Sequence, residues 1–303
     1  MPPPPPAHPV PRLRSRAWMS RVSPRPWDTP SRTPRRVVSS NSPAFFETAS
    51  PRVFAHRGLA VSARVNENTL AAFSAAVAAG ATHLETDIRV SADGIAILHH
   101  DPTFEQAGRQ IPVASLPLDR LRDPAIGPGE SLTTLAELLA AFPSIPINVD
   151  LKSADAVDPA VEVILRADAR SRILLTSFSE RTRRRAMRRL GPVASSPGRW
   201  AGIVLILAHW IRLRPIFRRL ATRTEAVQFP EKYGPFPAMT PALIARLRDV
   251  GVESHVWTIN NPADIRRLIL AGVDGVITDR CDLAVSVIED LRAEGFCPSN
   301  EVH

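Results

Sequence analysis

From residue 52 onward, short apolar runs alternate with amphipathic stretches of helical length. Each crossover between parallel strands needs a connection of helical length, so this alternation is typical of a parallel α/β domain. Eight strands within about 250 residues fit a (β/α)8 barrel better than an open doubly wound sheet. The predicted fold class is therefore α/β, a TIM barrel with a disordered N-terminal extension. Strands are expected near 53–55, 83–88, 146–151, 172–176, 192–195, 226–228, 254–258 and 274–277, with a short extra strand at 95–98.

Residues suited to helix N-termini support these boundaries. Thr134 with Glu137 has the spacing of a capping box. Asp158, Thr240 and Asn261 each place a capping side chain before a proline, which is favoured at the first helical position. Each of these residues is expected to begin a helix on the outside of the barrel.

Most of the net charge lies in the N-terminal extension. The chain carries +8, and the first 52 residues contain nine arginines against two acids, which leaves +7 of that charge there. This Pro-, Arg- and Ser-rich segment has too little apolar content to bury, so we expect residues 1–50 to be disordered and residues 51–303 to form the barrel domain. No apolar core of a secretory signal follows its arginines.

Composition excludes several classes of protein. Apolar residues make up 44% of the chain and charged residues 22%, which excludes collagen and coiled coils. No apolar run reaches the roughly 18 residues of a spanning helix, so a polytopic membrane protein is excluded too. The only cysteines, Cys281 and Cys297, cannot form a disulfide framework. The predicted location is the cytoplasm, with peripheral association at the inner membrane surface as an alternative.

Acidic side chains follow the predicted strands at the end where TIM barrels place their chemistry. Glu85 and Asp87 are two residues apart on one strand, so both point to the same face, about 6 to 7 Å apart at the backbone. Asp150 and Lys152 repeat this spacing on the next strand. Three carboxylates around one pocket repel one another unless cations intervene. Hard oxygen donors of this kind suit Mg²⁺ or Ca²⁺, which is the predicted cofactor.

Two histidines flank these acids. His56 and Arg57 follow the first strand, and His100 follows the short run after residue 95. Cleavage of a phosphodiester needs a base for the nucleophile, an acid for the leaving group and positive charge on the nonbridging oxygens. Two imidazoles, one metal ion and Arg57 together would supply these roles.

Several motifs in a fixed order resemble the glycerophosphodiester phosphodiesterase family over residues 52–290. The motifs are His56-Arg57-Gly58, Glu67-Asn68-Thr69, Glu85-Thr86-Asp87, Asp93-Gly94 leading to His100-Asp101, Asp150-Leu151-Lys152, Ser177-Phe178, Trp257-Thr258-Ile259-Asn260 and Asp274-Gly275-Val276-Ile277-Thr278-Asp279.

The resemblance implies a TIM-barrel phosphoric diester hydrolase of lipid and glycerol metabolism. Such an enzyme would use a divalent cation to convert a glycerophosphodiester, its small-molecule partner, to glycerol 3-phosphate and an alcohol. By the family pattern, the acid/base pair is His56 and His100, the metal ligands are Glu85, Asp87 and Asp150, the phosphate is held by Arg57 and Lys152, the glycerol packs on Trp257, and Glu67 and Asp101 orient these groups from behind.

The sequence departs from the family pattern in several places, and one of them is Asn66, where Pro is usual. The third metal ligand is more often Glu, and Asp150 is one methylene shorter. His99 precedes the expected histidine, and Asp101 as the next residue selects His100 instead. The family insertion, here 102–133, is rich in Pro and Gly and shows no fold of its own in the sequence, so the alcohol moiety is unreadable.

The segment 201–211 is apolar on almost every side if helical, and arginines follow it. It fits either a barrel helix with solvated arginines or an interfacial membrane anchor through 201–220. The membrane alternative would favour a lysophospholipase D-type reaction on membrane lysophospholipids at the same site. Two other classes remain open: an inactive membrane-associated scaffold, and a nucleic-acid binder driven by the extension. No aromatic-basic motif accompanies its arginines, so no nucleic acid is expected. The oligomeric state stays open.

Overall fold

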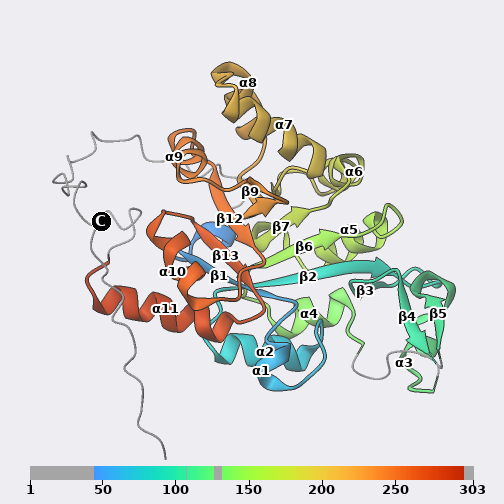
Figure 1. The fold of residues 1–303 in the computed structure, drawn as a ribbon. Helices are drawn as coiled ribbons and strands as arrows, with labels where there is room; N and C mark the ends of the chain where they lie inside the picture. Colours follow the sequence, from blue (N-terminus) through green and yellow to red (C-terminus); the bar gives the residue numbers. More distant parts are fainter. Residues whose placement is uncertain (1–43, 107, 126–131, 297–303) are drawn as a thin grey trace, which may run out of the picture. The chain divides into compact units, whose positions relative to one another are not determined.

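The computed structural model describes residues 44–106, 108–125 and 132–296. Its main sheet holds eight parallel strands in the order β8-β7-β6-β2-β1-β13-β12-β9 (Figure 1). These strands are β1 (Arg52–His56), β2 (His83–Val90), β6 (Ile147–Leu151), β7 (Ile173–Thr176), β8 (Ala194–Ser195), β9 (Ala226–Pro230), β12 (Glu253–Trp257) and β13 (Gly275–Thr278). All eight expected parallel strands are present, and the predicted TIM barrel is confirmed.

The two outermost strands of this order, β8 and β9, nearly close the barrel. The backbone N–H of Glu225 donates to the carbonyl of Ser195 at 3.2 Å, and the N–H of Gln228 donates to Ser196 Oγ at 3.0 Å. These bonds join the two edges without a regular strand ladder.

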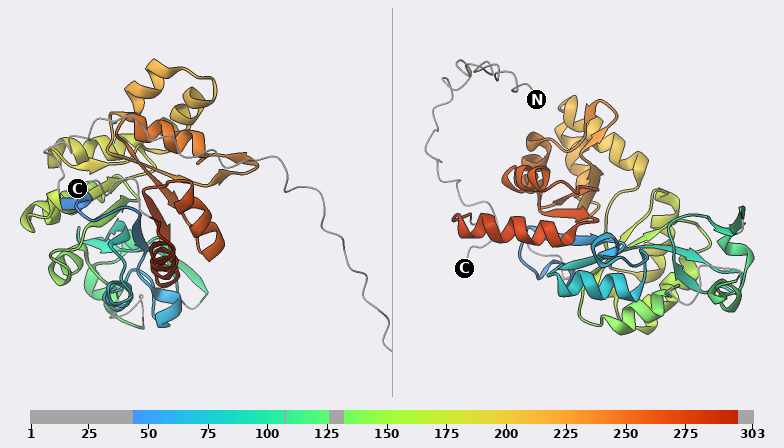
Figure 2. Two further views of the ribbon diagram at one scale, coloured as in Figure 1. Left: turned by 90° about the vertical axis from the view of Figure 1, so that its left-hand side faces the viewer. Right: turned by 60° about the horizontal axis from the view of Figure 1, so that its bottom comes forward.

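Helices cover the outer face of the barrel (Figure 2). They are α1 (Ala60–Ala63), α2 (Leu70–Ala78), α4 (Leu135–Ala141), α5 (Val157–Arg166), α6 (Glu180–Leu190), α7 (Arg199–Trp210), α8 (Arg214–Ala221), α9 (Pro241–Asp249), α10 (Pro262–Leu270) and α11 (Cys281–Ala293). Thr134 and Glu137 form the predicted capping box, and Thr240 and Asn261 cap α9 and α10 as expected.

Asp158 does not cap a helix, contrary to prediction. The N-cap of α5 is Ala156, and Asp158 lies in the first helical turn without a capping bond. Its carboxylate instead binds Arg185 and Arg189 of α6, so two helices are joined across their exposed faces.

The interior of the barrel is filled from below by the 3-10 turn η1 (Ala44–Phe46). Phe45 is fully buried against Phe54 and His83 of the barrel strands. The predicted domain boundary at residue 50 therefore falls within packed chain, because the residues just before it contribute to the core. Residues 1–43 of the expected extension lie outside the described residues.

The described parts of the insertion 102–133, for which no fold was expected, form a small structured unit. The extra strand β3 (Ala96–Leu98) pairs antiparallel with β2, as predicted at 95–98. Beyond it lie the hairpin β4 (Thr103–Gln106) and β5 (Arg109–Pro112), the 3-10 turn η2 (Val113–Ser115) and α3 (Leu118–Arg122). Buried side chains give this unit its own apolar core, namely Ile97, Phe104, Val113, Leu121 and Leu132.

The apolar segment after β8 forms two helices, α7 and α8, where a single helix was expected. The chain breaks between them at Arg212, whose φ is +57°, and Pro215 lies in the first turn of the second helix, which begins at Arg214. Arginines 214, 218 and 219 therefore belong to α8. After β9 the chain adds a short hairpin, β10 (Lys232–Tyr233) and β11 (Phe236–Pro237). Among the described residues, no helix is long and apolar enough to cross a bilayer.

Candidate active site

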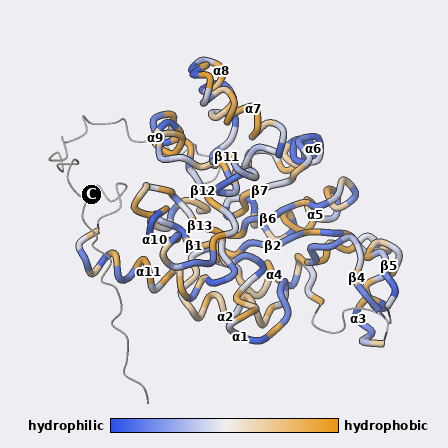
Figure 3. Tube along the Cα trace, in the orientation of Figure 1, coloured by the Kyte–Doolittle hydropathy of each residue, from blue (hydrophilic) through white to orange (hydrophobic). Residues whose placement is uncertain are grey.

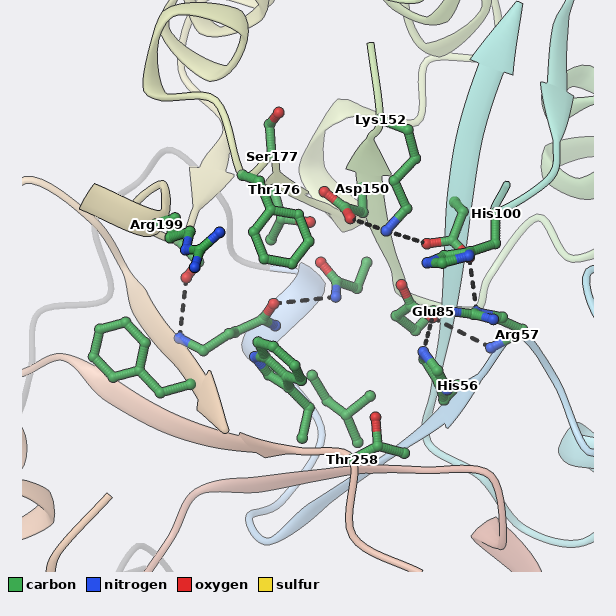
Figure 4. Close-up of a pocket in the computed structure, with 18 of the residues that line it drawn as sticks. His56, Arg57, Glu85, His100, Asp150, Lys152, Thr176, Ser177, Arg199 and Thr258 are labelled. Carbon is green, nitrogen blue, oxygen red and sulfur yellow. Dashed lines mark hydrogen bonds and ion pairs between the residues drawn. The ribbon is translucent and has the colours of Figure 1, made fainter. Parts of the chain in front are cut away.

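A pocket of about 190 Å³ opens at the carboxyl ends of the barrel strands (Figure 4). Two of the ten predicted site residues do not line the pocket but bind residues that do: Glu67 pairs with Arg57, and Asp101 pairs with His100. The other eight line the pocket, and they are His56, Arg57, Glu85, Asp87, His100, Asp150, Lys152 and Trp257. Parallel packing thus brings side chains from distant parts of the sequence to one place, as TIM barrels do.

The acids come from neighbouring strands in register. Asp87 on β2 lies beside Asp150 on β6. The amine of Lys152 lies 2.7 Å from Asp87 Oδ1 and 2.5 Å from Asp150 Oδ2, and Arg57 Nε lies 2.8 Å from Asp87 Oδ2. Asp87 is 1% exposed, and burial alone would raise its pKa. The two cations outweigh burial and hold the pKa of Asp87 below its ordinary value, so this carboxylate stays charged.

Glu85 forms no ion pair with the side chains of Arg57 and Lys152, unlike Asp87 and Asp150. Its Oε2 accepts a hydrogen bond from the backbone N–H of Arg57 at 3.2 Å, and His56 Nε2 lies 3.8 Å away. Burial, together with the charge of Asp87, raises the pKa of Glu85 to about 8. Additional positive charge beside Glu85 would therefore be strongly favourable.

Both predicted catalytic histidines have a carboxylate at Nδ1. His56 Nδ1 donates to Asp279 Oδ1 at 2.6 Å, and His100 Nδ1 donates to Asp101 Oδ1 at 2.8 Å. A hydrogen bond at Nδ1 fixes the tautomer and leaves Nε2 to act on another group. Burial lowers the pKa of His56, but the charge of Glu85 and the bond to Asp279 raise it more, so its pKa lies above the ordinary value.

Sequence reasoning gave Asp279 no role in the site. It directly follows β13, and Asn260 Nδ2 donates to its Oδ2 at 2.7 Å, which holds the carboxylate toward His56. The available signal was its place at the end of a barrel strand, which is where polar residues are expected to be functional.

His99 does not line the pocket. Its Nε2 faces the backbone carbonyl of Thr103 at 3.4 Å, next to the hairpin formed by β4 and β5. The neighbouring His100 lines the pocket and binds Asp101. The two adjacent histidines are therefore in different environments.

One wall of the pocket is aromatic. The rings of Trp257 and Phe178 meet edge to face, with centroids 6.2 Å apart, and Lys152 Nζ lies 5.5 Å from the centre of the Phe178 ring. Phe229 and Tyr233 extend this wall. Of these four aromatic residues, the sequence predicted only Trp257 as a wall.

Several polar lining residues were not predicted, among them Asn148, Gln228 and Arg199. Asn148 Nδ2 donates to Gln228 Oε1 at 3.2 Å across the floor of the pocket. Arg199, the first residue of α7, lies across the pocket from Glu85 (Figure 4) and has no ion-pair partner within the described part of the chain. None of the three belongs to a motif, so local sequence gave no signal for them.

The donors suit a hard divalent cation in their chemistry, because three carboxylates meet in one pocket. Across residues 44–106, 108–125 and 132–296, however, no three Asp, Glu, His or Cys side chains are already grouped as a metal site. The amine of Lys152 lies between Asp87 and Asp150.

Comparisons with known proteins agree with this geometry. The model of the glycerophosphoryl diester phosphodiesterase family matches residues 56–283. The probable glycerophosphodiester phosphodiesterase 2 of Mycobacterium tuberculosis is 38% identical over 236 residues, which is 77% of this chain and 89% of that protein.

Solved structures share the fold. The glycerophosphodiester phosphodiesterase of Thermotoga maritima gives a TM-score of 0.61 at 25% identity, over 78% of this chain and 97% of that one. A phosphodiesterase of Oleispira antarctica, solved with the product sn-glycerol-3-phosphate, gives a TM-score of 0.62 at 22% identity, over 79% of this chain and 97% of that one.

Fold, pocket and relatives define a phosphoric diester hydrolase built on a TIM barrel. The family match covers well over half of the sequence. The chain belongs to the glycerophosphoryl diester phosphodiesterase family, so the resemblance inferred from the motifs is confirmed.

Proposed function

We propose that this protein hydrolyses glycerophosphodiesters to glycerol 3-phosphate and an alcohol by general acid and base catalysis. The observation that carries the proposal is the pair of imidazoles facing one pocket, each held at Nδ1 by a carboxylate. Membership of the family supports the same reaction.

The surroundings of His56 indicate its role. Glu85 and Asp279 raise the pKa of His56, which favours the protonated imidazole that a general acid needs. His56 Nε2 is therefore the donor to the leaving alkoxide, and His100 Nε2 is the base that takes a proton from the attacking water. This choice could not be made from the sequence.

The charged and aromatic walls orient the substrate between these groups. Arg57 and Lys152 carry the positive charge that the phosphoryl oxygens need, and Asp87 holds both of them in place. Trp257 and Phe178 offer an apolar surface on which the glycerol carbons pack. Glu67 and Asp101 act from behind, by fixing Arg57 and His100.

Glu85, Asp87 and Asp150 would hold Mg²⁺ or Ca²⁺ in this pocket. The ion pairs support this, because Arg57 and Lys152 bind Asp87 and Asp150, while burial and the charge of Asp87 raise the pKa of Glu85. When bound, the cation would neutralise charge that develops on the phosphoryl oxygens.

The catalytic assignment is tested on glycerophosphocholine by measuring release of glycerol 3-phosphate. His56→Ala and His100→Ala should each lower kcat by about 10²- to 10⁴-fold without unfolding the protein. His99→Ala is the matched control and should stay near the wild-type rate, since His99 does not line the pocket. Equal losses in all three variants would contradict the assignment.

Metal binding is tested separately, by calorimetric titration of Mg²⁺ and Ca²⁺ into protein treated with EDTA. Wild type should bind one equivalent, and Glu85→Gln should weaken binding by about 10- to 100-fold. Glu105→Gln, an exposed residue on β4, is the control. Unchanged binding by Glu85→Gln would remove Glu85 from the ligand set.

A further inference from the structure

Helix α7 leaves one apolar face uncovered. Trp200, Val204, Leu207 and Ile211 follow one another at spacings of four, three and four residues, which places them on one side of the helix. All four are exposed, Trp200 by 72% and Ile211 by 65%. Such a face on a surface helix is normally turned toward the core.

The opposite face of α7 is already packed on the barrel. Leu205 and Ile206 are buried, and a Cβ atom at Gly202 would lie 2.3 Å from the ring of Phe229 on β9. The contact with Phe229 is tight enough to fix how α7 is turned. The exposed side chains therefore cannot reach the core by rotation of the helix.

The uncovered face continues onto neighbouring elements. Trp210 is exposed at the end of α7, and its ring centroid lies 6.2 Å from that of Phe236 on β11, which is 59% exposed. Figure 3 shows hydrophobic residues along α7 and both kinds of residue on α8. We call the whole set the α7–α8 surface, made up of Trp200, Val204, Leu207, Trp210, Ile211, Leu213, Ile216 and Phe236.

The charged side chains of α7, α8 and the turns that flank them have one sign. Between Arg199 and Thr224 the sequence contains six arginines and no Asp or Glu. Each of these arginines is exposed, and they are Arg199, Arg212, Arg214, Arg218, Arg219 and Arg223. Two copies of such a surface would repel each other, whereas an anionic lipid bilayer complements both its charge and its apolar side chains. Exposed tryptophan is also favoured at the interface between lipid and water.

The α7–α8 surface adjoins the mouth of the pocket. Arg199 begins α7 and Tyr233 lies in the hairpin that carries Phe236, and both residues line the pocket. Contact of this surface with a bilayer would therefore bring the pocket opening to the level of the lipid head groups.

We propose that the α7–α8 surface binds anionic lipid bilayers. This binding does not depend on the proposed function. Neither α7 nor α8 has the length of a spanning helix, so the two helices lie in the interface with their apolar side chains inserted.

Binding is tested by sedimentation of the full chain with vesicles of phosphatidylcholine containing phosphatidylglycerol, and with vesicles of phosphatidylcholine alone. Wild type should bind the anionic vesicles more tightly, and added salt should weaken binding. Leu207→Ser combined with Ile211→Ser should weaken binding at least about tenfold. Leu165→Ser with Leu270→Ser, which alters equally exposed leucines on α5 and α10, should bind like wild type.

Charge is tested with a second pair of variants. Arg218→Glu with Arg219→Glu on α8 should abolish the preference for anionic vesicles. The control is Arg181→Glu with Arg188→Glu, exposed positions on α6, which should keep that preference. The Arg-rich first 52 residues are present in every variant, so differences between variants belong to the α7–α8 surface.

Three results would overturn bilayer binding: no binding by wild type at low salt, equal binding by the α7 and control variants, or self-association that the α7 variant alone abolishes. If wild type binds vesicles but does not cleave glycerophosphocholine, the proposed function fails and bilayer binding stands.

Discussion

His56 has a partner that its position in the sequence does not indicate. The sequence places His56 at the end of the first strand beside two carboxylates on the next one. The structure adds Asp279, which is 223 positions away and accepts a hydrogen bond from His56 Nδ1. Asp279 fixes the ring, and together with the charge of Glu85 it raises the pKa of His56, although burial opposes this. We therefore treat Asp279 as a positioning residue.

Replacing Asp279 should change the pH dependence of catalysis as well as its rate. Asp279→Asn removes the negative charge at Nδ1, so the pKa of His56 should fall. His56 as general acid would then lose its proton at lower pH, and the alkaline limb of the kcat/KM profile should move down by about one pH unit. The maximal rate should fall by about 10- to 100-fold.

The matched control is Asp282→Asn. Asp282 lies three residues further on and binds Arg280 and Ser62 instead of a histidine. Its profile should keep the wild-type alkaline limb. If Asp279→Asn loses rate with an unchanged limb, Asp279 has only a structural role.

Period-two spacing predicted which carboxylates share the pocket. Glu85 and Asp87 had to face one side of a strand, and Asp150 the same mouth. Spacing could not predict that Lys152 would bind Asp87 and Asp150 together, because this contact depends on the register between β2 and β6. Arg199 and Gln228 were missed for a related reason, since only the closed barrel brings them to the pocket.

Helix α6 is tied to the start of α7 by one acid. Glu180 binds Arg183 and Arg184 of its own helix and accepts a hydrogen bond from the N–H of Gly198, which precedes α7. Burial would raise the pKa of Glu180, but these partners lower it to about 2. The carboxylate thus joins two elements, one of which carries the pocket residue Arg199.

Glu180→Gln should destabilise the protein by about 1–2 kcal/mol at pH 7, because Arg183 is buried and would lose its charged partner. The folded pKa lies below the unfolded one, so this contribution is complete above about pH 4.5 and is lost as the pH falls toward 2. Urea unfolding of wild type and variant should therefore converge over that range. Glu162→Gln, in an exposed pair with Arg166, should change stability by less than about 0.5 kcal/mol.

At the scale of elements, periodicity predicted the strands well and the short hairpins poorly. The parallel strands have long apolar runs, whereas β4, β5, β10 and β11 are two to four residues each and carry too few positions to show a period. The break between α7 and α8 was hidden because apolar residues continue through it. Asp158 was misplaced because the helix begins one residue earlier, at Val157, although a proline follows Asp158.

At the scale of the whole molecule, one buried histidine in the barrel connects the strands to η1. His83 is 0% exposed, and its Nε2 donates to the carbonyl of Phe45 at 2.9 Å, while Nδ1 accepts from Thr82 Oγ1 at 2.9 Å. The sequence around His83 does not indicate that Phe45 is its partner, and only the fold shows that η1 covers this ring. Burial lowers the pKa of His83 to about 3, and the nearby charge of Arg52 acts in the same direction.

This histidine should make the stability of the whole domain depend on pH. The unfolded chain binds a proton at His83 below about pH 6.5, whereas the folded chain resists it down to about pH 3, so stability is lost as the pH falls between these values. From pH 7 to pH 5 the loss due to His83 should be about 2 kcal/mol. His83→Gln keeps a donor for Phe45 but cannot titrate. Between pH 7 and pH 5 the free energy of unfolding of this variant should therefore fall by about 2 kcal/mol less than that of wild type. Urea unfolding at pH 8, 7, 6 and 5 measures the difference in free energy of unfolding between the two proteins, which should stay constant from pH 8 to 7 and shrink below pH 7. Parallel curves down to pH 5 would mean that His83 titrates alike in both states.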